Sequence, residues 1–161
     1  MEAWTDFFVA EVGAAAALAG LLVVAMSINI KEIMAMPTLP PRAAQTLIII
    51  GGALVLASLG LFPHQTLTAF GWEAVLAGIV VVLTGALEVR NLFVRRERSD
   101  PLFWSLYPLL LVLLTALPPL VGGLLLIGGN ETGLYWVAAG IIIAFLTTLQ
   151  GGWVLLVEIL R

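Results

Sequence analysis

Long apolar runs separated by short polar segments dominate this chain. A helix needs about 20 mostly apolar residues to cross a bilayer core of about 30 Å. Five runs reach this length, at approximately residues 7–30, 43–62, 68–89, 102–127 and 133–158. The pattern therefore predicts an all-α integral membrane bundle of about five transmembrane helices, which form one transmembrane domain over residues 1–161.

Turn-forming residues occupy the connections between the runs. The first connection contains Pro37, Pro40 and Pro41, which prevent a helix from continuing. The second breaks at Pro63, and the fourth reads GGNETG. Connections this short leave no room for a separate soluble domain.

Two adjacent prolines interrupt the fourth run. Pro118 and Pro119 have no backbone N–H, so the carbonyls of Leu114 and Thr115 lose their usual helical partners. We expect this helix to kink or split there, with neighbouring helices satisfying the freed carbonyls.

The distribution of positive charge predicts the orientation in the membrane. The chain has seven Lys and Arg residues, which are Lys31, Arg42, Arg90, Arg95, Arg96, Arg98 and Arg161. With five spans all seven fall on one side, and the positive-inside rule identifies that side as the cytoplasm. We therefore expect the N-terminus outside the cell and the C-terminus in the cytoplasm. Aromatic residues gather near both expected boundaries, as is usual in membrane proteins.

Composition excludes several classes of function. The chain is 61% hydrophobic and 11% charged, whereas a soluble domain carries about a quarter charged residues. A formal net charge of −3 without a basic stripe argues against nucleic-acid binding. There is no cysteine and only one histidine, His64, and no catalytic motif is recognisable. We expect no enzymatic activity, no cofactor and no metal site.

Small residues recur at helical spacing in two of the runs. They are Gly13, Ala17 and Gly20 in the first run and Gly71, Gly78 and Gly85 in the third. Such faces let helix backbones approach closely in lipid. They can pack within one chain or between copies of it. Five slim helices have little interior to share, which favours self-association.

A polar residue stands near each end of the first run. Glu11 and Asn29 are eighteen residues apart, which is five helical turns, so both project from the same face. Leu18 and Leu22 lie between them on that face. Several copies around an axis would form an acidic ring, an apolar constriction and a polar mouth, which suits a gated cation pathway. Glu73 lies similarly near the outer boundary of its run.

Structural alternatives exist for both polar residues. Glu11 can reach the lipid headgroups or bond a neighbouring helix, and Asn29 can cap a helix end. Ionisable groups within membrane spans are costly and often functional. The two interpretations of Glu11 therefore stay open.

The first half of the chain resembles a group of small bacterial membrane proteins. The resemblance rests on DFFVAEVGAAAALAGLLVVAMSINI and LPPRAAQTLIIIGGALVLASLG, with an FFxAxxGAxAALxGL-type start and a SIN sequence before a proline-rich loop. It implies a multi-pass protein of the bacterial inner membrane. It supplies no established activity and no site residue.

Two functional hypotheses follow. The first is a homo-oligomeric, channel-like protein with a cation or proton pathway lined by the first helix. The alternative is a non-catalytic scaffold or modulator of another membrane complex, which would associate through its small-residue faces and its basic loop. Arg95, Arg96 and Arg98 in that loop are also suited to contact anionic lipid headgroups. The expected partners are the lipid bilayer, further copies of the chain and another membrane protein.

Overall fold

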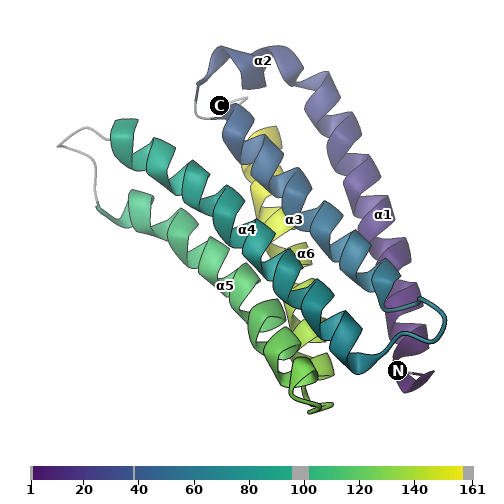
Figure 1. Cartoon of the computed structure of the whole chain (residues 1–161). Helices are drawn as coiled ribbons and strands as arrows, with labels where there is room; N and C mark the ends of the chain where they lie inside the picture. The colour runs from purple at the N-terminus through teal and green to yellow at the C-terminus, as the bar shows by residue number, and fades with distance from the viewer. Residues whose placement is uncertain (1, 38, 96–101, 158–161) are drawn as a thin grey trace.

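Five long helices form an antiparallel bundle (Figure 1). The computed structural model describes residues 2–37, 39–95 and 102–157. The long helices are α1 (Thr5–Ile28), α3 (Leu39–Leu59), α4 (Leu67–Arg95), α5 (Leu102–Ile127) and α6 (Gly133–Val157), with a short η1 (Glu2–Trp4) and α2 (Ile30–Ala35) on either side of α1. All five long helices are long and apolar enough to cross a membrane. The predicted all-α class and the number of spanning helices are confirmed.

The first connection differs from the prediction. Helix α3 begins at Leu39, so Pro40 and Pro41 lie inside its first turn instead of in the loop. Proline is tolerated there, because the N–H groups of a first turn have no partner within the helix. At the other side of the connection, Asn29 leaves the helical conformation and separates α1 from the short α2.

The expected split in the fourth span is not present. Helix α5 runs as one element through Pro108, Pro118 and Pro119. Helix α6 makes room for Pro118 and Pro119, since a Cβ on Gly140 would lie 2.8 Å from Cδ of Pro119 and 3.4 Å from Cβ of Pro118. A glycine on the neighbouring helix therefore accommodates the prolines without a break.

The start of α1 and the end of α6 lie at opposite ends of the bundle (Figure 1). We call the end with the N-terminus the N-end; it also holds the α3–α4 and α5–α6 connections. The other end, with α2 and the C-terminal end of α6, is the C-end. Helix α1 lies at the edge of the bundle and contacts α3 and α6. Its buried face is narrow and comprises Phe8, Ala15, Leu22 and Met26.

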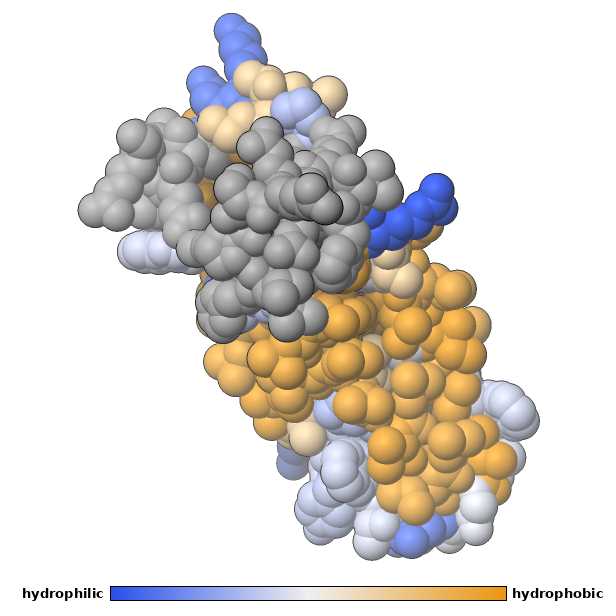
Figure 2. All heavy atoms as spheres, turned by 90° about the vertical axis from the view of Figure 1, so that its left-hand side faces the viewer, coloured by the Kyte–Doolittle hydropathy of each residue, from blue (hydrophilic) through white to orange (hydrophobic). Residues whose placement is uncertain are grey.

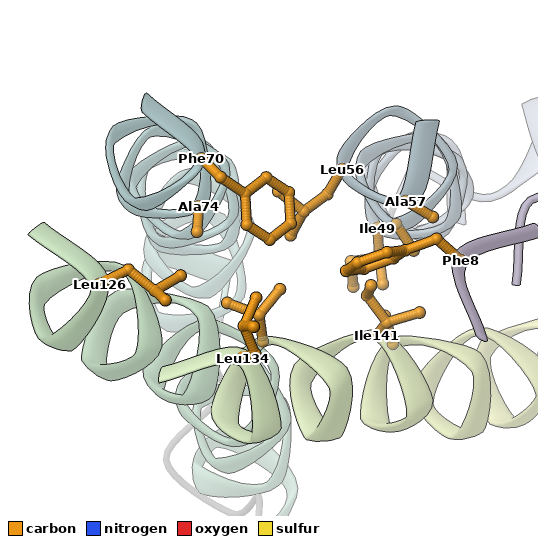
Figure 3. Packing of buried hydrophobic residues seen from close by; sticks show 12 residues of the cluster. Phe8, Ile49, Leu56, Ala57, Phe70, Ala74, Leu126, Leu134 and Ile141 are labelled. Carbon is orange, nitrogen blue, oxygen red and sulfur yellow. The ribbon is translucent and has the colours of Figure 1, made fainter. Parts of the chain in front are cut away.

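Apolar side chains close the bundle interior at the N-end (Figure 3). We define this apolar plug as Phe8, Leu56, Phe70, Leu126, Leu134 and Ile141, which all belong to one buried cluster. The rings of Phe8 and Phe70 meet edge to face with centroids 5.5 Å apart, an arrangement that adds stability beyond the buried area. Every long helix contributes at least one side chain, so the plug joins the whole bundle.

The outer surface suits a lipid environment. On the face shown in Figure 2, apolar side chains cover most of the middle of the molecule, and the polar ones gather toward its two ends. Large apolar side chains such as Leu21, Leu76 and Leu146 are more than 60% exposed on the long helices. These features fit a multi-pass membrane protein.

Candidate functional site

The predicted pathway face of α1 is packed inside the chain. Leu22 is 4% exposed, and together with Leu18 it packs against Ile50 of α3 and Phe145 of α6. A Cβ on Gly152 of α6 would lie 2.8 Å from Cδ2 of Leu22. Within one chain, α3 and α6 therefore cover Leu22 and part of Leu18, which argues against a path between copies at these two positions.

The polar residues of that face lie at its ends. Glu11 and Asn29 are both half-buried. The Asn29 side chain donates from Nδ2 to the carbonyl oxygen of Ala25 at 3.1 Å, and its backbone N–H donates to the same oxygen at 3.3 Å. Asn29 thus ends helix α1, as the structural alternative holds.

Glu73 takes part in a different feature. Its Oε2 accepts a hydrogen bond of 2.6 Å from Nε2 of Gln65 in the α3–α4 connection. It lines a groove between α3 and α4 to which Glu11 does not contribute. The two glutamates therefore belong to separate surroundings.

The two small-residue faces have different neighbours. Gly71, Gly78 and Gly85 all face α5: a Cβ on Gly71 would lie 2.8 Å from the carbonyl oxygen of Gly123, and one on Gly78 would lie 2.6 Å from Cγ of Leu120. This face therefore packs within the chain.

The other small-residue face is uncovered in this chain. Gly13, Ala17 and Gly20 are exposed on α1, and a Cβ on either glycine would meet nothing within 4 Å. Of the expected headgroup-binding arginines, Arg96 and Arg98 lie outside the described residues, and Arg95 is described only as the last residue of α4.

A polar cluster that sequence reasoning missed lies inside the bundle, toward the C-end. Four helices contribute to it: Arg42, Gln45 and Thr46 from α3, Glu88 from α4, Thr115 from α5, and Thr147 and Gln150 from α6. The glutamine Gln45 and all three threonines are less than 9% exposed. The sequence did contain a signal for this cluster, namely polar residues within apolar runs. Such residues are energetically costly in a membrane and are often functional.

Part of the cluster is held by backbone hydrogen bonds. Thr46 Oγ1 donates to the Arg42 carbonyl oxygen at 2.9 Å, and Thr147 Oγ1 donates to that of Ile143 at 3.0 Å. A Cβ on Gly151 would lie 2.6 Å from Oγ1 of Thr46, so α3 and α6 approach closely here. These bonds fix the hydroxyl groups that face the interior.

Two buried polar atoms of the cluster have no hydrogen-bond partner within the part of the chain that the structure describes. They are Nε2 of Gln45 and Oε1 of Gln150. Each such group costs about 1–3 kcal/mol on the scale of protein mutational data. Polar groups kept at this cost are suited to bind water or a transported species.

Two small cavities follow the bundle axis from this cluster. The inner cavity, of about 40 Å³, is lined by Arg42, Gln45, Thr46, Glu88, Thr147 and Gln150, among others. The middle cavity, of about 30 Å³, lies nearer the N-end, and its lining includes Thr115, Leu56 and Ile141. Either is large enough for water, which needs roughly 10–15 Å³ by this kind of measure.

A pair of hydroxyl groups joins the two cavities. Thr147 lines the inner cavity and Thr115 lines the middle one, and their Oγ1 atoms are 3.4 Å apart. Thr115 Oγ1 also lies 2.8 Å from the carbonyl oxygen of Leu111. A hydroxyl has one proton to donate, so Thr115 can give it to either acceptor. Leu56 and Ile141, in the wall of the middle cavity, belong to the apolar plug.

Two opposite charges line the inner cavity. Arg42 and Glu88 are half-buried on neighbouring helices, both line the cavity, and the charge of Arg42 acts on Glu88. Within the described ranges, no three His, Asp or Glu side chains lie together as a carboxylate or imidazole metal site would require. The cluster therefore offers one carboxylate (Glu88), one guanidinium group (Arg42) and several hydroxyl and amide groups.

Removing the amide of Gln45 should not harm the fold. We expect Gln45→Met, which has a similar volume, to leave the free energy of unfolding unchanged or to raise it by up to about 1–3 kcal/mol, because a buried unpaired N–H group disappears. Denaturation in mild detergent, followed by circular dichroism, measures this. Thr46→Val is the control and should lose about 1 kcal/mol, because its hydroxyl is hydrogen-bonded. A larger loss for Gln45→Met than for Thr46→Val would contradict the expectation.

No protein-family model, curated protein or solved structure matches this chain. Its function is therefore inferred from its own residues.

Proposed function

We propose that this chain is a small, channel-like membrane protein that passes protons through the interior of its own bundle. The observation that supports this most strongly is the buried polar cluster, in which Gln45 and Gln150 each have an unpaired polar atom and line the same cavity as Glu88. The proposed path runs from the inner cavity, past Thr147 and Thr115, to the apolar plug. It replaces the path along α1 that the sequence suggested.

Protons fit these cavities better than metal cations do. A water needs roughly 10–15 Å³ by this measure, so cavities of about 40 and 30 Å³ hold only a few waters each. They suit a short chain of waters better than a metal ion with its hydration shell. Hydroxyl groups both donate and accept, so they can relay a proton between waters.

The apolar plug supplies the closure that such a path needs. Apolar constrictions block ion and proton passage by excluding water. Passage would require water to enter between the side chains of the plug.

We further propose the orientation and location expected from the sequence. All seven Lys and Arg residues would lie at the cytoplasmic side. The C-end and its inner cavity would then face the cytoplasm of a bacterium, and the plug would lie toward the outside. We propose no enzymatic role.

Glu88→Gln tests the proposal. In liposomes that contain a pH-sensitive dye and purified protein, with a potassium diffusion potential as the driving force, the wild type should take up protons faster than empty liposomes. Glu88→Gln removes the carboxylate of the inner cavity and should lower this rate at least tenfold. A tenfold change in rate corresponds to about 1.4 kcal/mol in the free-energy barrier to proton passage.

Glu11→Gln is the matched control, because it makes the same change on α1 and should keep the wild-type rate. Circular dichroism and elution volume verify that both variants fold. Absence of flux in the wild type, or equal flux in Glu88→Gln, would overturn the proposal. Loss of flux in Glu11→Gln alone would instead place the path on α1.

The uncovered small-residue face of α1 favours a second candidate. Gly13, Ala17 and Gly20 are open to the membrane in this chain, and such faces promote helix association. The second candidate is therefore a non-catalytic scaffold that associates with itself or with another membrane complex. A folded wild type without proton flux would favour it.

A further inference from the structure

A groove of about 450 Å³ separates α3 from α4. Its walls include Gly51, Val55 and Leu59 of α3, and Leu76 and Val80 of α4. Val55 is 57% exposed and Leu76 is 62% exposed, so the groove opens sideways, toward the membrane. A Cβ on Gly51 would meet nothing within 4 Å, so the missing side chain of this glycine widens the groove.

The length of the groove matches one leaflet of a bilayer. Its α3 wall runs from Ile48 to Leu59, which is about 16 Å at 1.5 Å per residue. This is about half of a hydrocarbon core of about 30 Å. A single acyl chain from one leaflet would therefore cover the apolar walls.

A carboxylate marks the N-end of the groove. Glu73 lines it there and accepts the hydrogen bond from Gln65 of the α3–α4 connection. Trp72 and Phe62 are exposed close by in the sequence, and exposed aromatic residues are typical of the level of the lipid headgroups. An ionised carboxylate has about four acceptor positions, so Glu73 can accept further bonds beside the one from Gln65.

The charge around this end complements a cationic group. Lys and Arg are absent from residues 1–30 and 43–89 of the sequence, which include the start of α1 and the α3–α4 connection. Glu73 and Asp6 supply negative charge at the N-end. An anionic headgroup would be repelled here, and an ammonium group would be attracted.

We infer that the α3–α4 groove binds one phospholipid with a primary ammonium headgroup, of the phosphatidylethanolamine type. The acyl chain lies between α3 and α4, and the ammonium group donates hydrogen bonds to the Glu73 carboxylate. Charge-assisted bonds of this kind are about twice as strong as neutral ones. This inference does not depend on proton passage.

Retention of defined lipids tests the inference. The full chain is reconstituted in equal amounts of phosphatidylethanolamine and phosphatidylglycerol, extracted with mild detergent, and examined by native mass spectrometry. The wild type should retain one phosphatidylethanolamine in preference to phosphatidylglycerol. Glu73→Gln should lower the ratio of the two retained lipids at least fivefold. Glu11→Gln, which changes a carboxylate outside the groove, should keep the wild-type ratio.

A second variant tests the acyl-chain part. Gly51→Leu places a side chain in the groove without meeting other atoms at its Cβ, and it should reduce retention of both lipids. An unchanged lipid ratio in Glu73→Gln, or a wild-type preference for phosphatidylglycerol, would overturn the inference. A wild-type dimer without bound lipid that becomes monomeric in Gly51→Leu would also overturn it, and would show that a second copy fills the groove.

Discussion

Gly123→Ala should destabilise the bundle by about 3 kcal/mol, at the upper end of the usual cost of overpacking. The added Cβ would lie 2.5 Å from the carbonyl oxygen of Gly71, 2.7 Å from Cγ2 of Val75 and 2.9 Å from the Val75 nitrogen. Two of these atoms belong to the backbone and cannot rotate away. Helices α4 and α5 would therefore have to separate along their contact.

Gly13→Ala is the matched control for this change. Gly13 is also a helical glycine, but nothing lies within 4 Å of the position of its Cβ. The control should leave stability unchanged or raise it by up to about 1 kcal/mol, because alanine favours helix. Denaturation of both variants in detergent, followed by circular dichroism, measures the difference. Equal midpoints would show that the close contact of α4 and α5 contributes little to stability.

Leu56→Asn should raise the rate of proton uptake by liposomes at least tenfold. Leu56 is 4% exposed, lines the middle cavity and belongs to the apolar plug. Asparagine has a similar size but offers hydrogen bonds to water, so water can enter a layer that otherwise excludes it. The amide would extend the polar path from Thr115 into the plug.

The same substitution at Leu22 distinguishes a proton path through the bundle from one along α1. Leu22 is also 4% exposed, but it packs among α1, α3 and α6 and lines neither cavity. Leu22→Asn should therefore disturb packing to a similar degree and leave proton uptake unchanged. A rise in Leu22→Asn without one in Leu56→Asn would return the path to α1.

The existence of the five spanning helices was predictable from the sequence because lipid imposes strong constraints. A spanning segment must satisfy its backbone hydrogen bonds internally and must be long enough to cross the core. Both requirements produce long apolar runs that are easily recognised in the sequence. The start of α3 and the continuity of α5 were not predictable in the same way, because they depend on how Pro40 and Pro119 fit their surroundings.

Which face of a helix meets which neighbour was not readable from the pattern. Helix α1 is apolar on nearly every side, so periodicity does not distinguish the buried Leu22 from the exposed Leu21. The sequence likewise did not show which of the two small-residue faces is covered. Gly78 is covered by α5 and Gly20 is open, although both have similar sequence surroundings.

The polar cluster escaped prediction because its members come from four helices. Each helix supplies only one to three of them, and residues such as Gln45 and Gln150 are far apart in the sequence. Only the folded arrangement brings them to one cavity. Glu11, the most conspicuous charge within a single apolar run, instead suggested a path along α1.

The narrow buried face of α1 has a consequence for biogenesis. Helices α4 and α5 are consecutive in the chain, so their tight contact can form as soon as both have been synthesised, with a short connection to close. Helix α1 is made much earlier, yet Leu22 needs Gly152 of α6 beside it. During translation, part of the packing face of α1 is therefore exposed to lipid until α6, the last spanning helix, has been inserted.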